Sequence, residues 1–500
     1  MRNRVFQVLA WMAGAFVGAT ALAEDWPMWG RTPDRMMSTP EKGVPTDWDV
    51  QTGKNIRWTA QLGSQSYGNP VVAGGLVVVG TNNEARRDPR YTADGGVLKV
   101  FRESDGKFLW QQYSPKLKSG RVNDWPYQGI CSTPLIEGDR LWYCTNRCEV
   151  VCLDISPLRR GESEARELWR VDMMDKLGVF PHNMTSSSIV AHEHLIYVIT
   201  GNGVDDTHKN IPAPKAPAIV AFHKNTGAVV WHDNAPGENI LHGQWASPAV
   251  AVINGQPQVI APLGDSWVYS YEALTGRLIW KFDTNRKDTV YPTTRNELIA
   301  TPVIWDNKMY IANGQDPEHG EGPGHLWCVD ITGSGDLSLE LDSRPKPKLG
   351  EARPPLAPGV IQPNPNARVP WHFHRVTTSE GTTLKSCDKM HRTISTVAIH
   401  DGLVFVPDFS GFLHCFDAKT GQRHWVYDME AAMWGSPMIA DGKVFLCDED
   451  GDVTIFECSR ELKVLATHNM GAASYCSPVF ANGTLYIMTR DKLFAIGGGK

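Results

Sequence analysis

The stretch Cys415-Phe416-Asp417-Ala418-Lys419-Thr420-Gly421-Gln422-Arg423-His424-Trp425 decides the fold, because its pattern returns along the chain. It overlaps a five-residue unit, Leu413 to Asp417, made of an apolar residue, any residue, a compact residue, an apolar residue and a polar residue. Alternation with a period of two is typical of a strand with one buried face. A Thr-Gly turn follows, and Trp425 lies eight positions after the end of the unit.

The five-residue unit occurs eight times in the chain of 500 residues. The copies are Leu98 to Arg102, Val150 to Asp154, Ile219 to His223, Val268 to Glu272, Leu326 to Asp330, Leu413 to Asp417, Val453 to Glu457 and Leu493 to Gly497. A hairpin precedes each copy, and its first strand opens with a small residue and usually a proline, which the first position of a strand tolerates. The residues between the two strands of this hairpin, such as Asp441-Gly442, favour a tight turn. Each repeat therefore predicts four antiparallel strands, A to D.

Tryptophans follow four of the copies at one fixed offset, eight positions after the last residue of the unit. These residues are Trp110, Trp231, Trp280 and Trp425. We interpret them, together with Trp58 near the N-terminus, as structural docking residues on strand D. Copies two, five and seven are irregular at this offset, although Trp169 is assigned to copy two.

Eight such repeats predict an all-β fold, an eight-bladed β-propeller of four-stranded antiparallel blades. The last repeat ends at Gly497 without a fourth strand, and Ile56 to Trp58 resembles the missing strand with its tryptophan. We expect this N-terminal strand to complete the last blade, which removes the exposed edges of the ring. Residues 24–500 are accordingly predicted to form a single propeller domain.

The N-terminus has the pattern of a cleaved signal peptide over residues 1–23. Arg2 and Arg4 precede an uncharged apolar run from Val8 to Leu22, and Ala21-Leu22-Ala23 fits the cleavage site. The first cysteine is Cys131, so no lipobox cysteine is present. We expect a periplasmic or secreted protein without a transmembrane segment after cleavage. A net charge of -6 does not indicate a nucleic-acid partner.

Ten cysteines in an exported chain raise the question of disulfides. Cys152, Cys328 and Cys415 occupy the central slot of the five-residue unit, which other copies fill with Ala, Ser, Val or Ile. We interpret these three as small buried apolar residues rather than disulfide partners. Cys144 and Cys148 flank a hairpin turn, and their pairing stays open.

The motif Cys415 to Trp425 resembles the tryptophan-docking motif of pyrroloquinoline-quinone (PQQ)-dependent alcohol dehydrogenases and their relatives. In that family the tryptophan of one blade stacks on the turn of the next. The opening Trp26-Pro27-Met28-Trp29-Gly30 is similar to the start of secreted bacterial proteins with PQQ-like repeats. The resemblance covers nearly all of the chain after residue 23. It implies the fold rather than an activity, because the motif is structural.

The chain departs from the dehydrogenases of this family in three respects. It has no Cys-Cys pair and no Cys-x-x-Cys-His haem motif, and no convincing match to their calcium-binding Glu, Asn and Asp. Another relative is the lipoprotein propeller subunit of the bacterial barrel-assembly machinery, which carries its lipid on a cysteine that is absent here. PQQ with Ca²⁺ therefore remains an open cofactor rather than a predicted one.

Long segments between strands B and C or between D and A are expected to crowd one mouth of the channel. They are Thr81 to Gly96, Gln111 to Ile130, Thr200 to Ala218, Asn313 to His325 and Asp342 to Thr393. The D–A lead-ins lie nearest the axis and supply the candidate ligand-binding residues. These are His182, Asn183, His242, Trp245, Arg295, Glu297, His391 and Trp434. The alternative is that these residues only pack the funnel.

A ring of Arg, His and Trp suits a planar, multiply anionic ligand, such as PQQ or an anionic sugar. Asp316 and Glu318 are candidate Ca²⁺ ligands, although a solvated loop is favoured there. The sequence thus predicts an exported propeller that binds a small-molecule ligand or an envelope protein partner as a scaffold. The alternative is a PQQ- and Ca²⁺-dependent dehydrogenase that oxidises an alcohol or sugar. Catalytic residues are not assigned.

Overall fold

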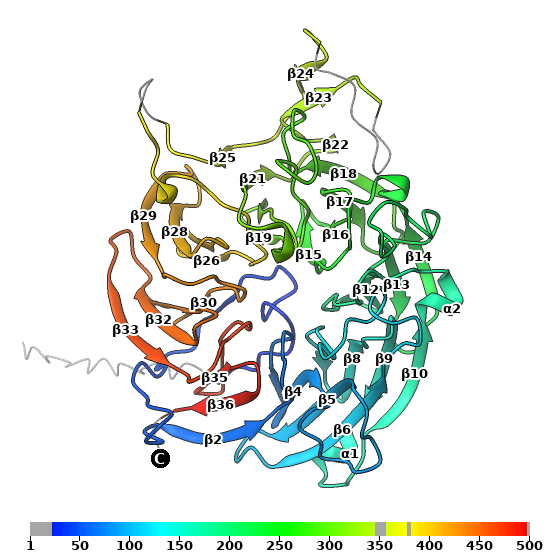
Figure 1. The fold of residues 1–500 in the computed structure, drawn as a ribbon, viewed down its shortest axis with the longest axis vertical. Helices are drawn as coiled ribbons and strands as arrows, with labels where there is room; N and C mark the ends of the chain where they lie inside the picture. The colour runs from blue at the N-terminus through cyan, green and yellow to red at the C-terminus, as the bar shows by residue number, and fades with distance from the viewer. Residues whose placement is uncertain (1–22, 346–356, 378–381, 498–500) are drawn as a thin grey trace, which may run out of the picture.

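A computed structural model describes residues 23–345, 357–377 and 382–497. Antiparallel sheets stand side by side around a central axis and close into a ring, as Figure 1 shows. The predicted signal peptide lies outside the described residues except for Ala23. Among the described residues, no helix has the length and apolar character needed to cross a membrane.

The sheets follow one another in chain order as eight blades. Blades 1 to 4 consist of β3 (Val71–Ala73), β4 (Leu76–Asn82), β5 (Gly95–Arg102) and β6 (Phe108–Pro115); β7 (Leu135–Glu137), β8 (Arg140–Cys144), β9 (Glu149–Asp154) and β10 (Arg166–Asp172); β11 (Val190–His192), β12 (Leu195–Ile199), β13 (Ile219–His223) and β14 (Val229–Asp233); and β15 (Ala249–Ile253), β16 (Gln256–Pro262), β17 (Trp267–Glu272) and β18 (Leu278–Asp283).

Blades 5 to 8 continue the same order around the axis. They consist of β19 (Val303–Trp305), β20 (Lys308–Ala312), β21 (Leu326–Asp330) and β25 (Trp371–Phe373); β26 (Ala398–His400), β27 (Leu403–Pro407), β28 (Phe412–Asp417) and β29 (Arg423–Asp428); β30 (Met438–Ala440), β31 (Lys443–Cys447), β32 (Asp452–Glu457) and β33 (Val464–Asn469); and β34 (Val479–Ala481), β35 (Thr484–Met488), β36 (Lys492–Ile496) and β2 (Ile56–Gln61). Each predicted five-residue unit is the third strand of its blade, so the predicted fold class is confirmed.

Helices are few and short. They are α1 (Ser156–Arg159), α2 (Met173–Leu177) and the 3₁₀ turns η1 (Gly237–Asn239), η2 (Pro317–His319) and η3 (Ser386–Asp388). The core lies between neighbouring blades, where apolar faces meet; Tyr197 and Trp231 of blade 3 pack with Val259 and Tyr269 of blade 4. All ten cysteines are free thiols, including Cys144 and Cys148. The central slot of strand C is buried, as predicted.

The N-terminal strand closes the ring. Strand β2 pairs antiparallel with β36, with Trp58 opposite Ala495, and Figure 1 shows these two strands side by side in one blade. Trp58 Nε1 donates to the Glu103 carbonyl of blade 1 at 2.9 Å. The predicted completion of the last blade is therefore confirmed.

Docking tryptophans join neighbouring blades at five places. Their indole N–H groups donate to a backbone carbonyl in the C–D turn of the next blade: Trp58 to Glu103, Trp169 to Lys224, Trp231 to Ala273, Trp371 to Ala418 and Trp425 to Ser459, at 2.8–3.1 Å. Four of these turns also carry a glycine at positive φ, where an added Cβ would meet the ring; at Gly276 it would lie 2.6 Å from Trp231 Cδ2. The glycine at this position thus allows the positive φ of the turn and leaves room for the tryptophan ring.

Trp110 and Trp280 differ from the other predicted docking residues. Trp280 Nε1 donates to Gln258 Oε1 of its own blade at 2.9 Å. Trp110 packs partly buried against the cluster that contains Leu158 of α1. The reason lies in the next blade in each case, because the C–D connections of blades 2 and 5 are long and replace the tight Thr-Gly turn.

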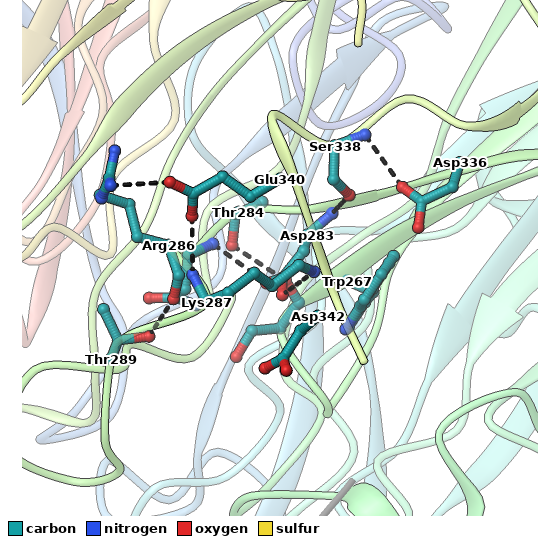
Figure 2. Close-up of polar contacts among 12 residues, drawn as sticks. Trp267, Asp283, Thr284, Arg286, Lys287, Thr289, Asp336, Ser338, Glu340 and Asp342 are labelled. Carbon is teal, nitrogen blue, oxygen red and sulfur yellow. Dashed lines mark hydrogen bonds and ion pairs between the residues drawn. The ribbon is translucent and has the colours of Figure 1, made fainter. Parts of the chain in front are cut away.

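The long excursion of blade 5 precedes strand D, which corrects its expected place in a D–A loop from Asp342 to Thr393. Its strands β22 (Gly335–Asp336), β23 (Glu340–Asp342) and β24 (Ile361–Pro363) lie between β21 and β25. Strand β22 pairs parallel with β18 and covers Trp280. Figure 2 shows Glu340 between the Arg286 side chain, at 2.7 Å, and the Lys287 amide. The excursion is therefore fastened to the outside of blade 4.

Residues 24–39, which we term the axial hub, cross the end of the channel nearest the A–B turns. Backbone hydrogen bonds join them to strand A or its A–B turn in seven blades: Trp26 to Val72, Pro27 to Ile136, Pro33 to Val250, Asp34 to Ile304, Met36 to Ile399, Met37 to Ile439 and Glu24 to Asn482. The buried Arg35 reaches blade 3 through the Ser188 carbonyl, at 3.1 Å. Strand β1 (Ser38–Thr39) adds a parallel edge to β30. Sequence analysis did not predict this hub.

Candidate functional site

The axis of the ring holds a cavity of about 360 Å³. Trp29 of the axial hub contributes to its lining, and Trp29 Nε1 donates to Thr301 Oγ1 at 3.1 Å. Aromatic side chains of the D–A lead-ins form much of the wall: Tyr67, Trp125, Trp245, Trp434 and Tyr475. The cavity therefore opens toward the face that carries the D–A connections.

One small polar residue from each blade lines the cavity at the start of strand A. These residues are Asn69, Thr133, Ser188, Ser247, Thr301, Thr396, Ser436 and Ser477. In seven of the eight steps around the ring, the backbone amide of one donates to the side-chain oxygen of the next, at 2.6–3.0 Å. At the remaining step, from Ser247 to Thr301, the Thr301 oxygen accepts from Trp29. The small polar residues at the start of strand A thus tie the blades together at the axis.

Three aromatic rings gather on one side of the mouth. Tyr67 stacks on Tyr475 with ring centroids 5.3 Å apart, and Trp434 lies edge-on to Tyr475 at 5.2 Å. Trp434 Nε1 donates to Glu449 Oε2 at 3.1 Å. Just outside the lining, the Arg121 guanidinium lies 3.7 Å from the ring centroid of Trp125 and 3.9 Å from Glu318 Oε1. The mouth thus combines stacking faces with acidic oxygens.

The ionisable carboxyl groups of the cavity lining come from the B–C loop of blade 5. Within the described chain, the lining includes Asp316 and Glu318 but no lysine or arginine. Burial raises the pKa of Asp316. Its Oδ1 accepts from the Glu318 amide at 2.9 Å and begins η2, and neither carboxylate belongs to the metal-type clusters found among the described residues. Their proposed Ca²⁺ role therefore gains no support from the geometry.

Arg295 lies away from the cavity, although it was expected to clamp an anionic ligand. Its Nη2 donates to Asp283 Oδ1 at 3.0 Å and to the Asp265 carbonyl at 3.2 Å. Asp283 is buried and also holds Lys287 Nζ at 2.7 Å. The guanidinium thus serves blade 4, because the sequence places its carboxylate partner at the end of strand β18.

Five of the predicted site residues converge beside the cavity. The rings of His182 and His242 have centroids 4.5 Å apart, and Trp245 Nε1 donates to the His182 carbonyl at 3.0 Å. Asn183, which lines the cavity, accepts the Trp125 amide with its carbonyl at 2.8 Å. Glu297 Oε1 lies 3.4 Å from His242 Nδ1. These residues come from three successive D–A lead-ins.

Two further histidines join this group from B–C loops. His208 of blade 3 has its ring centroid 4.6 Å from that of His242, and His319 of η2 lies 5.5 Å from it. Burial and the neighbouring His242 lower the pKa of His182 to about 3. Burial opposes the charged form of His242, but Glu297 outweighs it and raises the pKa of His242. Sequence analysis missed His208 and His319, because B–C loops follow no repeat.

His391 belongs to a separate polar cluster under blade 6. Its Nδ1 lies 2.9 Å from the buried Asp408 Oδ2, and its Nε2 lies 3.2 Å from Ser386 Oγ. His414 contacts the same Asp408 oxygen at 3.2 Å. Burial alone would raise the pKa of Asp408, but the hydrogen bonds from His391 and His414 lower it to about 2. This histidine therefore stays out of the funnel.

A model of the family described as outer membrane protein assembly factor BamB matches residues 94–346 and 368–498. The chain belongs to this family. Outer membrane protein assembly factor BamB of Yersinia pestis is 20% identical over 377 residues, which cover 72% of this chain and 84% of that protein. The chain is thus a PQQ-repeat propeller, as the tryptophan motif predicted, and the family model assigns it to the BamB family.

Two solved structures share the architecture. BamB from Moraxella catarrhalis superposes with a TM-score of 0.53 at 14% identity, and the match covers 88% of this chain and 96% of that chain. Quinohemoprotein alcohol dehydrogenase from Comamonas testosteroni gives a TM-score of 0.63 at 11% identity and covers 96% of this chain and 82% of that chain. At these identities the likeness shows the fold alone.

PQQ, the cofactor that the sequence resemblance left open, does not fit the lining of the funnel. An anionic quinone is held by cationic forks, because arginine pairs with carboxylates through two parallel hydrogen bonds. The described lining offers Asp316 and Glu318 instead, and Arg295 is engaged by Asp283. The sequence also has no Cys-Cys pair. The lining therefore favours a neutral or cationic occupant over an anionic cofactor.

Proposed function

We propose that this BamB-family propeller is an exported scaffold of the cell envelope that holds a segment of a partner protein in the mouth of its funnel. The observation that carries the proposal is the character of the described lining, which is aromatic and acidic, with Arg121 at its border already held by one ring and one carboxylate. Such a surface suits an extended segment with lysine or arginine between apolar residues. Cations bind over aromatic faces and beside carboxylates.

Arg121 shows how such a side chain would sit. Its guanidinium stacks on Trp125 and approaches Glu318 while most of its side chain stays exposed. At Tyr67, Trp434 and Tyr475 a partner's arginine would find stacking faces, and Glu449, which accepts from Trp434 Nε1, would supply the carboxylate. Contacts of this kind are worth about 0.5–2 kcal/mol each, so several are needed for stable binding.

The kinship supports a partner connected with the outer membrane. The Yersinia pestis relative is named an outer membrane protein assembly factor. An export signal over residues 1–23 and a periplasmic location are part of the same proposal. The partner is accordingly an envelope protein that takes part in outer-membrane assembly, and the segment that it offers is cationic and apolar.

Site-specific photo-crosslinking in intact cells tests the proposal. Benzoylphenylalanine replaces Tyr127, which is 54% exposed and adjoins the cavity-lining Gln128. The matched control is Val252, which is 57% exposed near the A–B turn of blade 4, on the closed side of the ring. We expect Tyr127 adducts with envelope proteins, identified by mass spectrometry, and none of the same adducts from Val252.

Two further variants show whether the chemistry of the mouth matters. Trp434→Ala and Glu318→Lys should each weaken the Tyr127 adduct several-fold, because one removes a stacking face and the other reverses a charge. Glu461→Lys makes the same charge change on an exposed C–D turn and should leave the adduct unchanged. Equal adducts from Tyr127 and Val252, or adducts insensitive to both mouth variants, overturn the proposal.

A further inference from the structure

Three histidines from separate loops meet beside the funnel. His182 lies in the connection between blades 2 and 3, His208 in the B–C loop of blade 3, and His242 in the connection between blades 3 and 4. One ring nitrogen of each lies within 4.8 Å of those of the other two. Their ring centroids are 4.5, 4.6 and 5.0 Å apart. We term these residues the three-histidine cluster.

Buried ring nitrogens in this cluster have no partner within the described structure. His182 and His242 are each 2% exposed. His182 Nε2 and His242 Nε2 make no hydrogen bond to the described residues, and His242 Nδ1 has only the long approach to Glu297. A buried polar atom without a partner is costly, so native proteins leave few of them. Two such atoms, on histidines whose ring centroids lie 4.5 Å apart, point to a ligand that completes them.

The second nitrogen of each buried histidine is already oriented. His182 Nδ1 lies 2.8 Å from the Val204 carbonyl oxygen. His242 Nδ1 lies 3.4 Å from Glu297 Oε1, and that oxygen accepts from Tyr291 at 2.9 Å. A metal-bound histidine typically directs its other N–H to a carbonyl or carboxylate, which fixes the tautomer. This leaves the Nε2 atoms of His182 and His242 as the atoms available to an ion.

We propose that His182, His208 and His242 bind one divalent transition-metal ion, with Glu297 as the positioning residue of His242. Neutral imidazoles favour zinc, copper and nickel, whereas calcium and magnesium prefer oxygen ligands. Three histidines leave a coordination position for water or for a side chain of a bound partner. His208 is exposed, so its loop can close the cluster toward metal–nitrogen distances of about 2.0–2.1 Å.

The ion has a defined relation to the funnel. The ring of Trp245 lines the cavity and lies edge-on to His242, with centroids 5.0 Å apart. The metal position is therefore separated from the cavity by this ring. An ion here would fix three loops of the mouth relative to one another. The inference concerns residues other than the aromatic and acidic wall of the proposed docking site, so each can fail alone.

A neighbouring arrangement shares His242 and defines the competing assignment. His242, Glu297 and His319 also offer ligand atoms within 4.8 Å of one another. A separate group, His325, His372 and His374, lies in blade 5, where His325 Nδ1 and His372 Nε2 are 2.9 Å apart and already face each other. Variants of His319 and His374 therefore serve as matched controls.

Titration of Zn²⁺ and Co²⁺ into chelator-treated full-length mature protein tests the proposal. Calorimetry gives the stoichiometry and affinity for Zn²⁺, and the visible band of Co²⁺ reports nitrogen ligation. We expect one ion to bind, and we expect His208→Ala to lower the affinity for it at least about 100-fold. Glu297→Gln should lower the affinity for the same ion by about 10–100-fold, the usual cost of losing such a partner. Exposed His208 makes its loss tolerable for folding, which circular dichroism of the metal-free protein checks.

The control variants decide between the assignments. His319→Ala, His374→Ala and the exposed His232→Ala should keep the wild-type affinity for this ion within about threefold. Unchanged binding in His208→Ala overturns the proposal, as does the absence of any Zn²⁺ binding tighter than to the unfolded chain. Loss of the ion in His319→Ala but not in His208→Ala also overturns it, because the ion would then belong to the neighbouring trio.

Discussion

Replacing Gly276 with alanine tests whether the tryptophans join the blades in the way the structure shows. Gly276 has φ of 73°, and an added Cβ would lie 2.6 Å from Trp231 Cδ2 of the preceding blade. Trp231 is held by its hydrogen bond to the Ala273 carbonyl and by Tyr197 and Tyr271 on either side. The ring therefore cannot retreat without loss of these contacts.

A matched glycine separates the two costs of the substitution. Gly402 has φ of 74°, and an added Cβ there meets nothing within 4 Å. Alanine in the left-handed region costs about 1–2 kcal/mol, which both variants share. Overpacking against a fixed side chain adds about 1–3 kcal/mol, which only Gly276→Ala incurs. We expect losses of about 2–5 kcal/mol for Gly276→Ala and about 1–2 kcal/mol for Gly402→Ala.

Equilibrium unfolding in urea, followed by tryptophan fluorescence and circular dichroism, measures the difference. In a Trp231→Ala background the ring is gone, so Gly276→Ala should cost no more than Gly402→Ala. The coupling free energy between positions 231 and 276 is then about 1–3 kcal/mol. Equal losses in Gly276→Ala and Gly402→Ala, or a loss that persists without Trp231, refute the docking argument.

Three other perturbations follow from the same contacts. Deletion of residues 24–60 removes strand β2 and the axial hub, so the protein should lose its cooperative thermal transition; an unchanged midpoint would contradict ring closure. Ser436→Ala leaves the buried Thr396 amide without its acceptor, so the free energy of unfolding in urea should fall by about 1–3 kcal/mol. An unchanged free energy of unfolding would contradict the axial ring of hydrogen bonds. Asp408, with its pKa lowered from 3.8 to about 2, stabilises the fold above pH 4; this contribution, about 2 kcal/mol, disappears as the pH falls toward 2, and Asp408→Asn should flatten that part of the stability profile.

Local periodicity was enough to predict the blades. The units from Leu98 to Arg102 and from Leu413 to Asp417 are both third strands. Both faces of each strand are buried, so the recurrence of one five-residue pattern marked them rather than the burial of a single face. The closing strand could be predicted for a similar reason, since the last repeat lacked one strand and Trp58 carried its signature. Such features can be predicted from residues that lie close together in the sequence.

Contacts between segments that are distant in the sequence could not be predicted in the same way. Trp371 replaces the expected tryptophan of blade 5, but an excursion separates it from Asp330 and hides the offset. The small residues before the prolines were visible, but their hydrogen-bond partners lie one blade away. Trp26 to Met37 follows no repeat, so its role as a hub has no periodic signal.

Residue type predicted which candidate residues lie together only where no local partner competed. His182, His242 and Glu297 lie close to one another, because each sits in a lead-in that blade geometry brings to the axis. Whether they bind a ligand stays a prediction. Arg295 sits in a similar lead-in, but Asp283 captures it. A charged side chain near the axis thus marks a ligand contact only if the blade itself does not neutralise it.

The axial hub gives the propeller one open face and thereby decides where function can reside. A ring of blades leaves a channel with two ends, and the hub joins the A strands at the end nearest the A–B turns. Trp29 then contributes to the wall of a cavity that opens toward the D–A connections. Both the acidic, aromatic wall and the three-histidine cluster lie on that side. Residues there are free of the blade repeat, so their chemistry can differ among propellers that share the same tryptophan docking.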